Sequence, residues 1–231
     1  MRAPAVVAVL AFCCAAIARA GDPALPGVKF KSSDRPVPCP ADLQRARSAE
    51  LQKLEDEDQA DRQGPIDSID WKVVGPRDDA RRARVAEIAA EGCLSSAKDY
   101  AAAALVYQHG ATSDDYLHAF AWFKKAVDLG DDSQKAMLAK GADRYLVSLG
   151  FKQLYATQAS KPSMNPSDCW CLEPVAQAMS EAQRAKYAER TLKESFSWVD
   201  KLNDQREKCL PARYCGKDLK DPPKGTLPGL W

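Results

Sequence analysis

Seven polar or charged side chains in this chain could do chemistry together. They comprise carboxylates, guanidinium groups, amides and one imidazole: Asp58, Arg62, Gln108, His109, Asp143, Arg144 and Gln153. An imidazole oriented by a carboxylate can act as a general base, and a nearby guanidinium group can stabilise an anion. Because buried polar groups must hydrogen-bond to one another or to a ligand, we expect these side chains to converge on one pocket.

Asp58 and Arg62 are the first candidate charge pair of this pocket. They are four residues apart, which suits an ion pair on one helix, and they follow Leu51 and Leu54 on the same helical face. Charges on a core-facing side need partners, because an unpaired buried charge is very costly. A pair between Asp143 and Arg62 is the alternative within the pocket. If the helix end is instead exposed, Asp58 and Arg62 form a surface pair worth only about 0.3–0.5 kcal/mol.

His109 is the imidazole of the predicted pocket, and its role has two interpretations. It lies in the last turn of a predicted helix, directly before a glycine. A histidine at this place can simply interact with the carbonyl end of its own helix. As a general base, it would be oriented by Asp58 or Asp143, while Arg62 or Arg144 would stabilise an anion.

No catalytic motif fixes the function class. The sequence contains no G-x-S-x-G, no H-E-x-x-H and no phosphate-binding loop. We therefore expect a helical binding or interaction domain whose partner is an unknown small molecule or protein. A hydrolase that uses the His/Asp/Arg site is the alternative, so whether the protein is an enzyme stays open. No cofactor or metal site is predicted, because Cys169 and Cys171 are separated by a single residue and no histidine lies near them.

Helical periodicity and capping residues predict an all-α single domain built of antiparallel helical hairpins. The helices are expected at residues 40–62, 77–91, 96–109, 116–129, 134–149 and 180–208. The loops on either side of the 116–129 helix are short, so its neighbours should run antiparallel to it. The connector at 64–76 holds four residues that we expect to pack onto the core: Ile69, Trp71, Val73 and Val74.

The segment 135–158 should position much of the pocket. An apolar stripe follows helical spacing there: Leu138, Ala142, Tyr145, Leu146 and Leu149. At about 100° per residue, Asp143 flanks this stripe and Arg144 points almost opposite it. Arg144 is then either a solvated surface charge or covered by a second layer of protein. Gly150 stops the helix, and the irregular tail after it offers further hydrogen-bonding groups, including Gln153.

The first 20 residues have the features of a secretory signal peptide. Arg2 supplies the positive charge, residues 4–17 form an apolar run too short to span a bilayer, and Ala18-Arg19-Ala20 is a small-x-small cleavage site. We expect a signal peptide at 1–20, an extended lead-in at 21–38, a helical domain at 39–209 and a coil tail at 210–231. The protein would thus be exported to the periplasm or the extracellular space, with no membrane span after cleavage.

The charge balance argues against nucleic acid as a partner. The chain of 231 residues has a formal net charge of +1. Removal of the signal peptide takes away Arg2 and Arg19, which leaves 31 basic residues against 32 acidic ones. A near-neutral protein lacks the basic excess that nucleic acids or anionic membranes attract.

Six cysteines remain after the expected cleavage, and an even number in an exported chain indicates three disulfides. They are Cys39, Cys93, Cys169, Cys171, Cys209 and Cys215. We expect Cys39 to pair with Cys93. The 169/171 pair should reach the 209/215 pair and brace the tail, because two cysteines one residue apart rarely satisfy disulfide geometry with each other. A local bond between the cysteines at 209 and 215 is the main alternative.

Five stretches of the chain carry motifs in a recognisable order. They are DQADR (58–62), AKDYAAAALVYQHG (97–110), TSDDYLHAFAWFKKAVDLG (112–130), DRYLVSLGFKQLYATQ (143–158) and LEPVAQAMSEAQRAKY (172–187). Together they resemble the DUF6624-like group of bacterial, often exported, proteins of unknown function. The resemblance covers nearly the whole chain after about Leu51 and implies no established activity. The family usually ends the central motif in Gly-Thr-Gln, whereas Ala156 stands here in place of the glycine; an alanine is strained there if the position requires a positive φ.

Overall fold

The structure is a computed structural model that describes residues 39–64, 68–163, 165, 167–204 and 206–231. Within this part of the chain there are seven α-helices and one short antiparallel sheet. The helices are α1 (Ala41–Ala60), α2 (Trp71–Ala90), α3 (Ala97–Gln108), α4 (Ser113–Asp128), α5 (Lys135–Ser148), α6 (Glu181–Ala188) and α7 (Leu192–Leu202). The strands are β1 (Ala159–Ser160) and β2 (Cys171–Leu172), and two 3₁₀ turns are η2 (Asp132–Gln134) and η3 (Glu207–Cys209). The predicted all-α fold is confirmed, whereas the expected signal peptide and lead-in lie outside the described residues.

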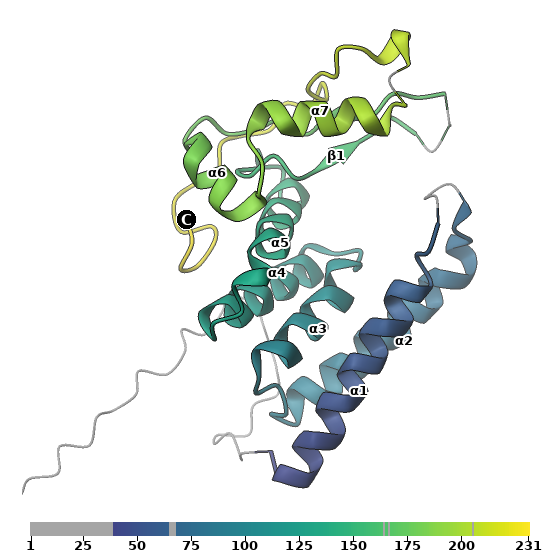
Figure 1. Cartoon of the computed structure of the whole chain (residues 1–231), viewed down its shortest axis with the longest axis vertical. Coiled ribbons are helices and arrows are strands. Elements are labelled where there is room, and N and C mark those ends of the chain that lie inside the picture. The colour runs from purple at the N-terminus through teal and green to yellow at the C-terminus, as the bar shows by residue number, and fades with distance from the viewer. Residues whose placement is uncertain (1–38, 65–67, 164, 166, 205) are drawn as a thin grey trace, which may run out of the picture.

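Capping residues set the boundaries of the central hairpins. Ser96 caps α3 and Thr112 caps α4, each in a capping box with the aspartate three residues later. In such a box the cap side chain accepts a backbone N–H of the first turn, and the acidic side chain accepts the N–H of the cap residue. These caps keep the loops around α4 short, so α3, α4 and α5 follow one another as the predicted hairpins (Figure 1).

The helices α1 to α6 share one core around α3, α4 and α5, whereas α7 packs on a second, smaller cluster with Leu172 and Val175. The pair α1 and α2 packs against α3, while α6 packs against α5 and α7 lies beyond it (Figure 1). Fully buried side chains fill the space between them: Leu51, Val85, Ile88, Phe120, Phe123, Leu138 and Leu146. The alanines at 102–104 have no exposed surface, so α3 approaches its neighbours closely. The carboxyl-terminal ends of α1 and α3 are therefore fixed relative to α5, and these three helices carry most of the predicted pocket.

The start of α2 differs from the prediction, because the helix begins at Trp71 rather than at residue 77. The side chain of Asp70 caps it, and Pro76 is accommodated inside it. The expectation that the connector packs onto the core is wrong for Trp71 and Val73, which are 44% and 45% exposed. Once this segment is helical, its periodicity turns these two side chains outward and leaves Val74 facing inward, where it is 5% exposed.

The predicted long helix at 180–208 is also corrected, because it is two helices. The helix α6 ends at Glu189, which takes a left-handed conformation with φ of 57°. Thr191 then starts α7 with a new capping box that includes Glu194. A strong amino-terminal cap inside a periodic segment ends one helix and starts the next. The segment just before α6 runs beside the segment after α5, since the backbone N–H of Gln153 donates to the carbonyl of Pro174 and the N–H of Ala176 donates to the carbonyl of Gln153.

Three disulfides connect the six cysteines, and they confirm the predicted pairing. The bonds are Cys39–Cys93, Cys169–Cys209 and Cys171–Cys215. The alternative of a local bond within the tail is wrong. The tail after η3 has no helix or strand among its described residues, as predicted, but it contributes Leu227, which is fully buried in the core.

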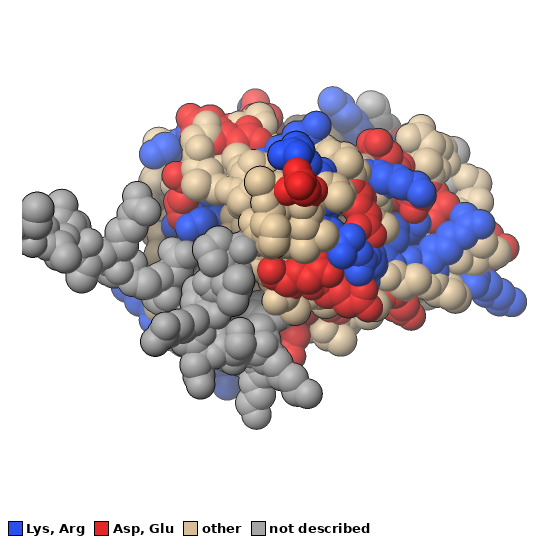
Figure 2. All heavy atoms as spheres, turned by 90° about the horizontal axis from the view of Figure 1, so that it is seen from below, with Lys and Arg blue, Asp and Glu red and all other residues tan. Residues whose placement is uncertain are grey.

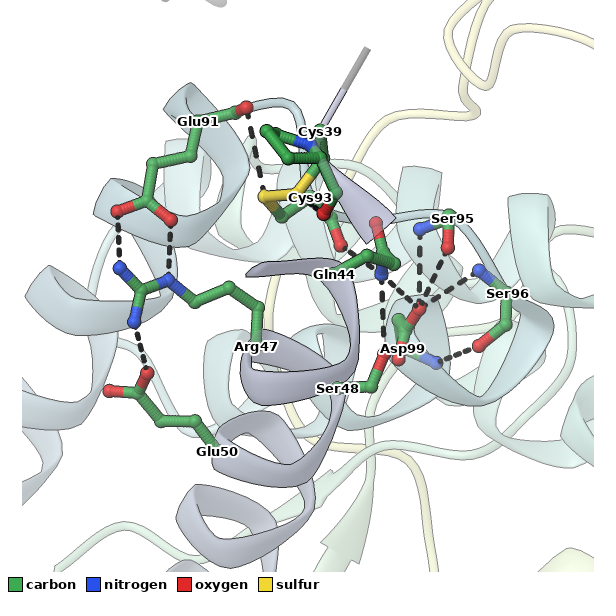
Figure 3. Close-up of a disulfide and its surroundings, with 11 residues drawn as sticks. Cys39, Gln44, Arg47, Ser48, Glu50, Glu91, Cys93, Ser95, Ser96 and Asp99 are labelled. Atoms are coloured by element: carbon green, nitrogen blue, oxygen red, sulfur yellow. Dashed lines mark hydrogen bonds and ion pairs between the residues drawn. A yellow bond between two sulfur atoms is a disulfide. The ribbon is translucent and has the colours of Figure 1, made fainter. Parts of the chain in front are cut away.

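The Cys39–Cys93 bond ties the start of α1 to the turn before α3 (Figure 3). Beside it, the side-chain amide of Gln44 donates to the carbonyl of Cys93 at 2.8 Å and to the carboxylate of Asp99 at 3.3 Å. Asp99 is also the acidic partner in the capping box of α3. The start of α1 is therefore attached to the start of α3 by a disulfide and by the hydrogen bonds of Gln44. One of these bonds reaches Asp99, which also caps α3.

The surface carries both signs of charge. Figure 2 shows acidic and basic side chains interspersed on the face that it presents. Among the described residues, no helix is long and apolar enough to cross a membrane.

Candidate functional site

A cleft of about 670 Å³ lies between the ends of α1 and α3, the side of α5, the turn that follows α5, and α7. Its polar lining consists of Gln59, Gln108, His109, Lys140, Arg144, Thr157 and Gln158. Its apolar lining consists of Leu105, Met137, Ala159, Trp170, Trp198 and Leu202. No aspartate or glutamate is among these lining residues. Three of the seven predicted side chains, those of Gln108, His109 and Arg144, thus face the same cleft.

Asp58 lies directly behind His109 and orients it. Its Oδ2 is 2.8 Å from Nδ1 of His109, and it also accepts a hydrogen bond of 2.9 Å from the side chain of Gln59. The carboxylate is fully buried, and Arg62 Nη1 lies 3.1 Å from its other oxygen. A carboxylate acceptor at Nδ1 requires the proton of the neutral ring on that nitrogen, which leaves Nε2 as the ring's acceptor. The side chain of His109 is 23% exposed and lines the cleft, so the imidazole is accessible to a ligand.

Arg62 lies one layer further from the cleft, in a buried charge network between α1 and α2. It pairs with Asp58, as the first alternative predicted, and not with Asp143. Its Nη2 also donates to Asp78 at 2.6 Å, and Asp78 in turn accepts from Arg81 at 2.6 Å. The interpretation of this end of α1 as frayed and exposed is wrong, since the side chain of Arg62 is 14% exposed.

Asp78 and Arg81 also belong to this network, although the sequence analysis did not select them. They are 6% and 5% exposed. Their positions could have revealed them, since both fall at helical spacing between Val74 and Val85, which are buried. The pair of Asp78 and Arg81 faces the core, although arginines and aspartates also alternate on the exposed side of α2.

Arg144 is not a free surface charge. Its Nη1 donates to the carbonyl of Gln108 at 2.5 Å, its Nε lies 3.3 Å from Oε1 of Gln158, and its guanidinium carbon is 5.7 Å from the ring centroid of Tyr116. Burial lowers the pKa of Arg144, and the charge of Arg62 adds to this effect. The second interpretation, in which protein covers this residue, is therefore confirmed. A guanidinium group at the carbonyl end of α3 is also favourably placed with respect to that helix.

Asp143 does not face the cleft but shapes the turn beside it. It is fully buried and accepts hydrogen bonds from the backbone N–H groups of Leu154, Tyr155 and Thr157, and from the hydroxyl of Thr157. Burial raises the pKa of Asp143 to about 6, although these donors act in the opposite direction. The turn includes Ala156 at φ of 60°, so this position does take the positive φ that a glycine favours.

Gln153 is also a positioning residue rather than a lining one. Its side-chain amide donates to the carbonyls of Gln158 and Glu173 at 3.0 and 2.7 Å, and its carbonyl oxygen accepts the backbone N–H of Gln158 at 2.7 Å. Asp143 and Gln153 therefore hold the segment 153–158 in a shape that brings Thr157 and Gln158 to the cleft. Of the seven predicted residues, Gln108, His109 and Arg144 line the cleft. The other four, Asp58, Arg62, Asp143 and Gln153, lie behind it and do not reach its lining.

Several lining residues had no signal in the sequence. Lys140 lies at the exposed rim, and its pKa is lowered by burial and by the charges of Arg190 and Arg144. Trp198 lines the cleft while the guanidinium carbon of Arg190 lies 4.3 Å from its ring centroid. Trp170 is the single residue between Cys169 and Cys171. Only the fold brings these residues together, because they come from segments far apart in the chain.

Neither a group of metal ligands nor a similar protein identifies what the cleft binds. Among the described residues, no group of three or more His, Cys, Asp or Glu side chains is arranged to hold a metal ion. Comparison with protein-family models, with curated proteins and with solved structures found no match for this chain.

Proposed function

We propose that the cleft binds a small anionic molecule that also has an apolar portion, and that the chain is an exported helical binding domain. The observation that carries this proposal is the charge of the lining. Lys140 and Arg144 line the cleft, whereas no carboxylate among the described residues does. An anion is the ligand that such a lining favours.

The basic groups around the cleft are close enough to affect one another. Burial is the main cause of the lowered pKa values of Lys140 and Arg144; the charges of Arg190 and Arg144 lower the pKa of Lys140 further, and the charge of Arg62 lowers the pKa of Arg144 further. In addition, Nε of Arg190 is buried without a hydrogen-bond partner among the described residues. Repulsion between like charges is relieved when an anion binds between them, so a bound anion would stabilise this arrangement.

The remaining lining suits the rest of an organic ligand. Trp170, Trp198, Leu105 and Met137 offer an apolar wall, and Gln59 and Gln158 offer amide groups for orientation. A cleft of about 670 Å³ lies within the size range of small-molecule sites. Mixed walls with a few convergent polar groups are typical of such sites.

Three disulfides support the exported part of the proposal, since stable disulfides form mainly in oxidising compartments. We also propose that the chain belongs to the DUF6624-like group. The supporting observation is that residues of its quoted motifs, including Gln59, Gln108 and Thr157, line one cleft together.

Isothermal titration with benzoate, phenyl phosphate and the neutral analogue benzamide tests the binding proposal. We expect the anions to bind and benzamide not to bind. Arg144→Gln should weaken anion binding by about tenfold or more, because a charge-assisted hydrogen bond is lost. Lys140→Gln at the exposed rim should weaken it by about two- to fivefold. Lys53→Gln is the matched control, because Lys53 is exposed on α1 and does not line the cleft.

Equal binding of benzamide and benzoate, or unchanged affinity in Arg144→Gln, would contradict the proposal. Circular dichroism of each variant would verify that the helices are intact.

A hydrolase is the second candidate, and the contact between His109 and Asp58 favours it. An enzyme of this kind needs its histidine within hydrogen-bond reach of a carboxylate and open to a cleft. Both conditions hold, with 2.8 Å between the two side chains. His109 Nε2 would take a proton from water, the hydroxide would attack an acyl carbon, and the proton would pass to the leaving alkoxide. Among the lining residues, the hydroxyl of Thr157 is engaged with Asp143, so water is the better nucleophile.

Hydrolysis of 4-nitrophenyl hemisuccinate, an anionic ester, tests this second candidate. His109→Gln should lower the rate by about 100-fold or more, as expected for loss of a general base. His118→Gln is the matched control, because His118 on α4 packs against Tyr107 of α3 and Trp122 and is not among the residues that line the cleft. If the native protein shows no rate above that of the His109→Gln variant, the hydrolase candidate is dropped and the binding proposal is unaffected.

A further inference from the structure

Trp170 is held in the wall of the cleft by covalent bonds of both its neighbours in the chain. It lies between Cys169 and Cys171, which form disulfides with Cys209 and Cys215. We call these two bonds together the double clasp. A residue flanked on both sides by cross-linked neighbours has little freedom to leave the wall.

Hydrogen bonds fix the same residue from a third side. The backbone N–H of Trp170 donates to Oδ1 of Asn203 at 2.7 Å, and its carbonyl accepts from Nδ2 of Asn203 at 3.1 Å. Asn203 is fully buried at the end of α7. Next to the clasp, the backbone N–H of Cys215 donates to the carbonyl of Leu172 at 2.8 Å. The backbone that carries the Trp170 ring is thus attached to α7 and to the tail.

The ring itself takes part in a wall of two indoles. Trp170 and Trp198 both line the cleft, and both pack against one small apolar cluster that includes Val199 and Leu172. A cation lies near each ring, with Nζ of Lys161 at 5.3 Å from the centroid of Trp170 and the guanidinium carbon of Arg190 at 4.3 Å from that of Trp198. Two indoles with neighbouring cations offer flat surfaces next to positive charge. An aromatic ring that bears an anion matches both features, since aromatic pairs gain energy beyond their buried area.

We propose that Trp170 is the specificity-determining residue of the cleft, that it selects anions carrying an aromatic ring, and that the double clasp positions it for this purpose. This inference rests on the proposed anion binding and names the class of ligand more narrowly. It also gives the two C-terminal disulfides a role in recognition, in addition to bracing the tail.

Two pairs of probes separate the ring from the anion. Phenyl phosphate and benzoate carry a ring, whereas methyl phosphate and acetate carry the same charged groups without one. Isothermal titration of the native protein should show that each ringed probe binds at least about tenfold more tightly than its ringless partner, through stacking and burial of the ring. We call this ratio the ring preference.

Trp170→Leu should reduce the ring preference to within about threefold, because the flat partner is lost while an apolar side chain remains. The double substitution C171S/C215S opens one bond of the clasp and should lower the preference in the same way. Because the ring preference is a ratio of two affinities of the same variant, a change in affinity common to ringed and ringless probes does not alter it.

Matched controls distinguish these effects from a general loss of stability. C39S/C93S removes a disulfide at the far end of α1, and Trp71→Leu removes an exposed tryptophan on α2. The Cys39–Cys93 bond and Trp71 do not line the cleft, so both controls should keep the native ring preference. Circular dichroism would verify that each variant is folded, and Trp170→Leu tests the ring even if C171S/C215S does not fold.

Each outcome decides a different part of the proposal. A ring preference that survives in Trp170→Leu overturns the role of this residue, and one that survives in a folded C171S/C215S variant overturns the role of the clasp. Equal binding of ringed and ringless anions overturns the selection while anion binding stands. Failure of all four probes to bind overturns the proposed function and this inference with it.

Discussion

At the scale of single residues, Asp143 shows how one carboxylate shapes the cleft without lining it. Its oxygens gather the backbone N–H groups of the turn after α5, and this turn presents Thr157 and Gln158. Two opposing effects act on it, because burial disfavours the charge while the donors favour it. Burial is the larger effect, and the pKa of Asp143 is raised to about 6.

The raised pKa predicts how stability changes with pH. Between about pH 4 and pH 6 the folded protein keeps a proton on Asp143 that the unfolded chain releases, so the contribution of this residue to stability falls as pH rises. Above pH 7 the stability lost through this residue approaches about 3 kcal/mol. This follows from the rise of its pKa from 3.8 to about 6, at about 1.4 kcal/mol per pKa unit. Other carboxylates titrate in the same range, so the quantity to measure is the difference in unfolding free energy between the native protein and Asp143→Asn.

Urea unfolding at several pH values gives this difference, with Asp128→Asn at an exposed position as the control. The difference should shrink as pH rises from 4 to 7. A difference that grows with pH would show that the backbone donors outweigh burial.

Ala156 allows a second test at the residue scale. Its φ of 60° is unfavourable for a residue with a Cβ atom, and its side chain is fully buried. Ala156→Gly relieves the strain but loses a buried methyl group and adds freedom to the unfolded chain, so we expect stability to change by less than about 1 kcal/mol. Ala156→Val, which is branched at Cβ, should lose more than about 2 kcal/mol. Equal thermal stability of the valine variant and the native protein would show that this backbone position is not strained.

At the scale of elements, a helix start could be predicted where the cap and the surrounding sequence agree, and it could not where they conflict. The starts of α3 and α4 follow from Ser96 and Thr112, because each cap satisfies donors in its own first turn. The start of α2 at Trp71 was not predicted, and Pro76 lies inside this helix although proline is unfavourable in a helix interior. The break between α6 and α7 depends on Glu189 in a left-handed conformation, which no glycine announced.

The candidate site shows the same division. Gln108, His109 and Arg144 were predicted because they are polar residues that the helical patterns do not explain. Lys140, Trp170 and Trp198 were not, because each is ordinary in its own segment and gains a role only from segments distant in sequence. A sequence reveals polar residues that fall on a core-facing side of a helix. It does not reveal residues that line a cleft but fit the pattern of their own segment.

The network between α1 and α2 carries an element-scale prediction. Arg62→Ala leaves Asp58 and Asp78 buried with one cation fewer, so we expect a loss of about 3–5 kcal/mol in unfolding free energy. Arg45→Ala is the control, because its pair with Asp42 is almost fully solvated and should contribute less than about 0.5 kcal/mol. Chemical denaturation measures both, and a loss below 1 kcal/mol in Arg62→Ala would mean that water compensates the two carboxylates.

At the scale of the whole molecule, the disulfides cross-link two separate regions of the described chain. One bond holds α1 to the turn before α3, and the double clasp holds the tail to the loop that carries Trp170. The cleft lies between residues from both parts, with Gln59 and His109 on one side and Trp170 and Trp198 on the other. Its shape thus depends on the fold as a whole, which is why the sequence predicted a pocket but not its aromatic wall.

The central claim, that this cleft receives an aromatic anion, is tested most directly by locating such a ligand. A crystal of the protein soaked in 4-bromobenzoate would place the ligand through the anomalous signal of bromine. We predict that the carboxylate lies within hydrogen-bond distance of Lys140 or Arg144, and that the ring lies against Trp170. Bromine bound only outside the cleft, or a cleft without ligand when titration shows that the protein is saturated, would contradict the account.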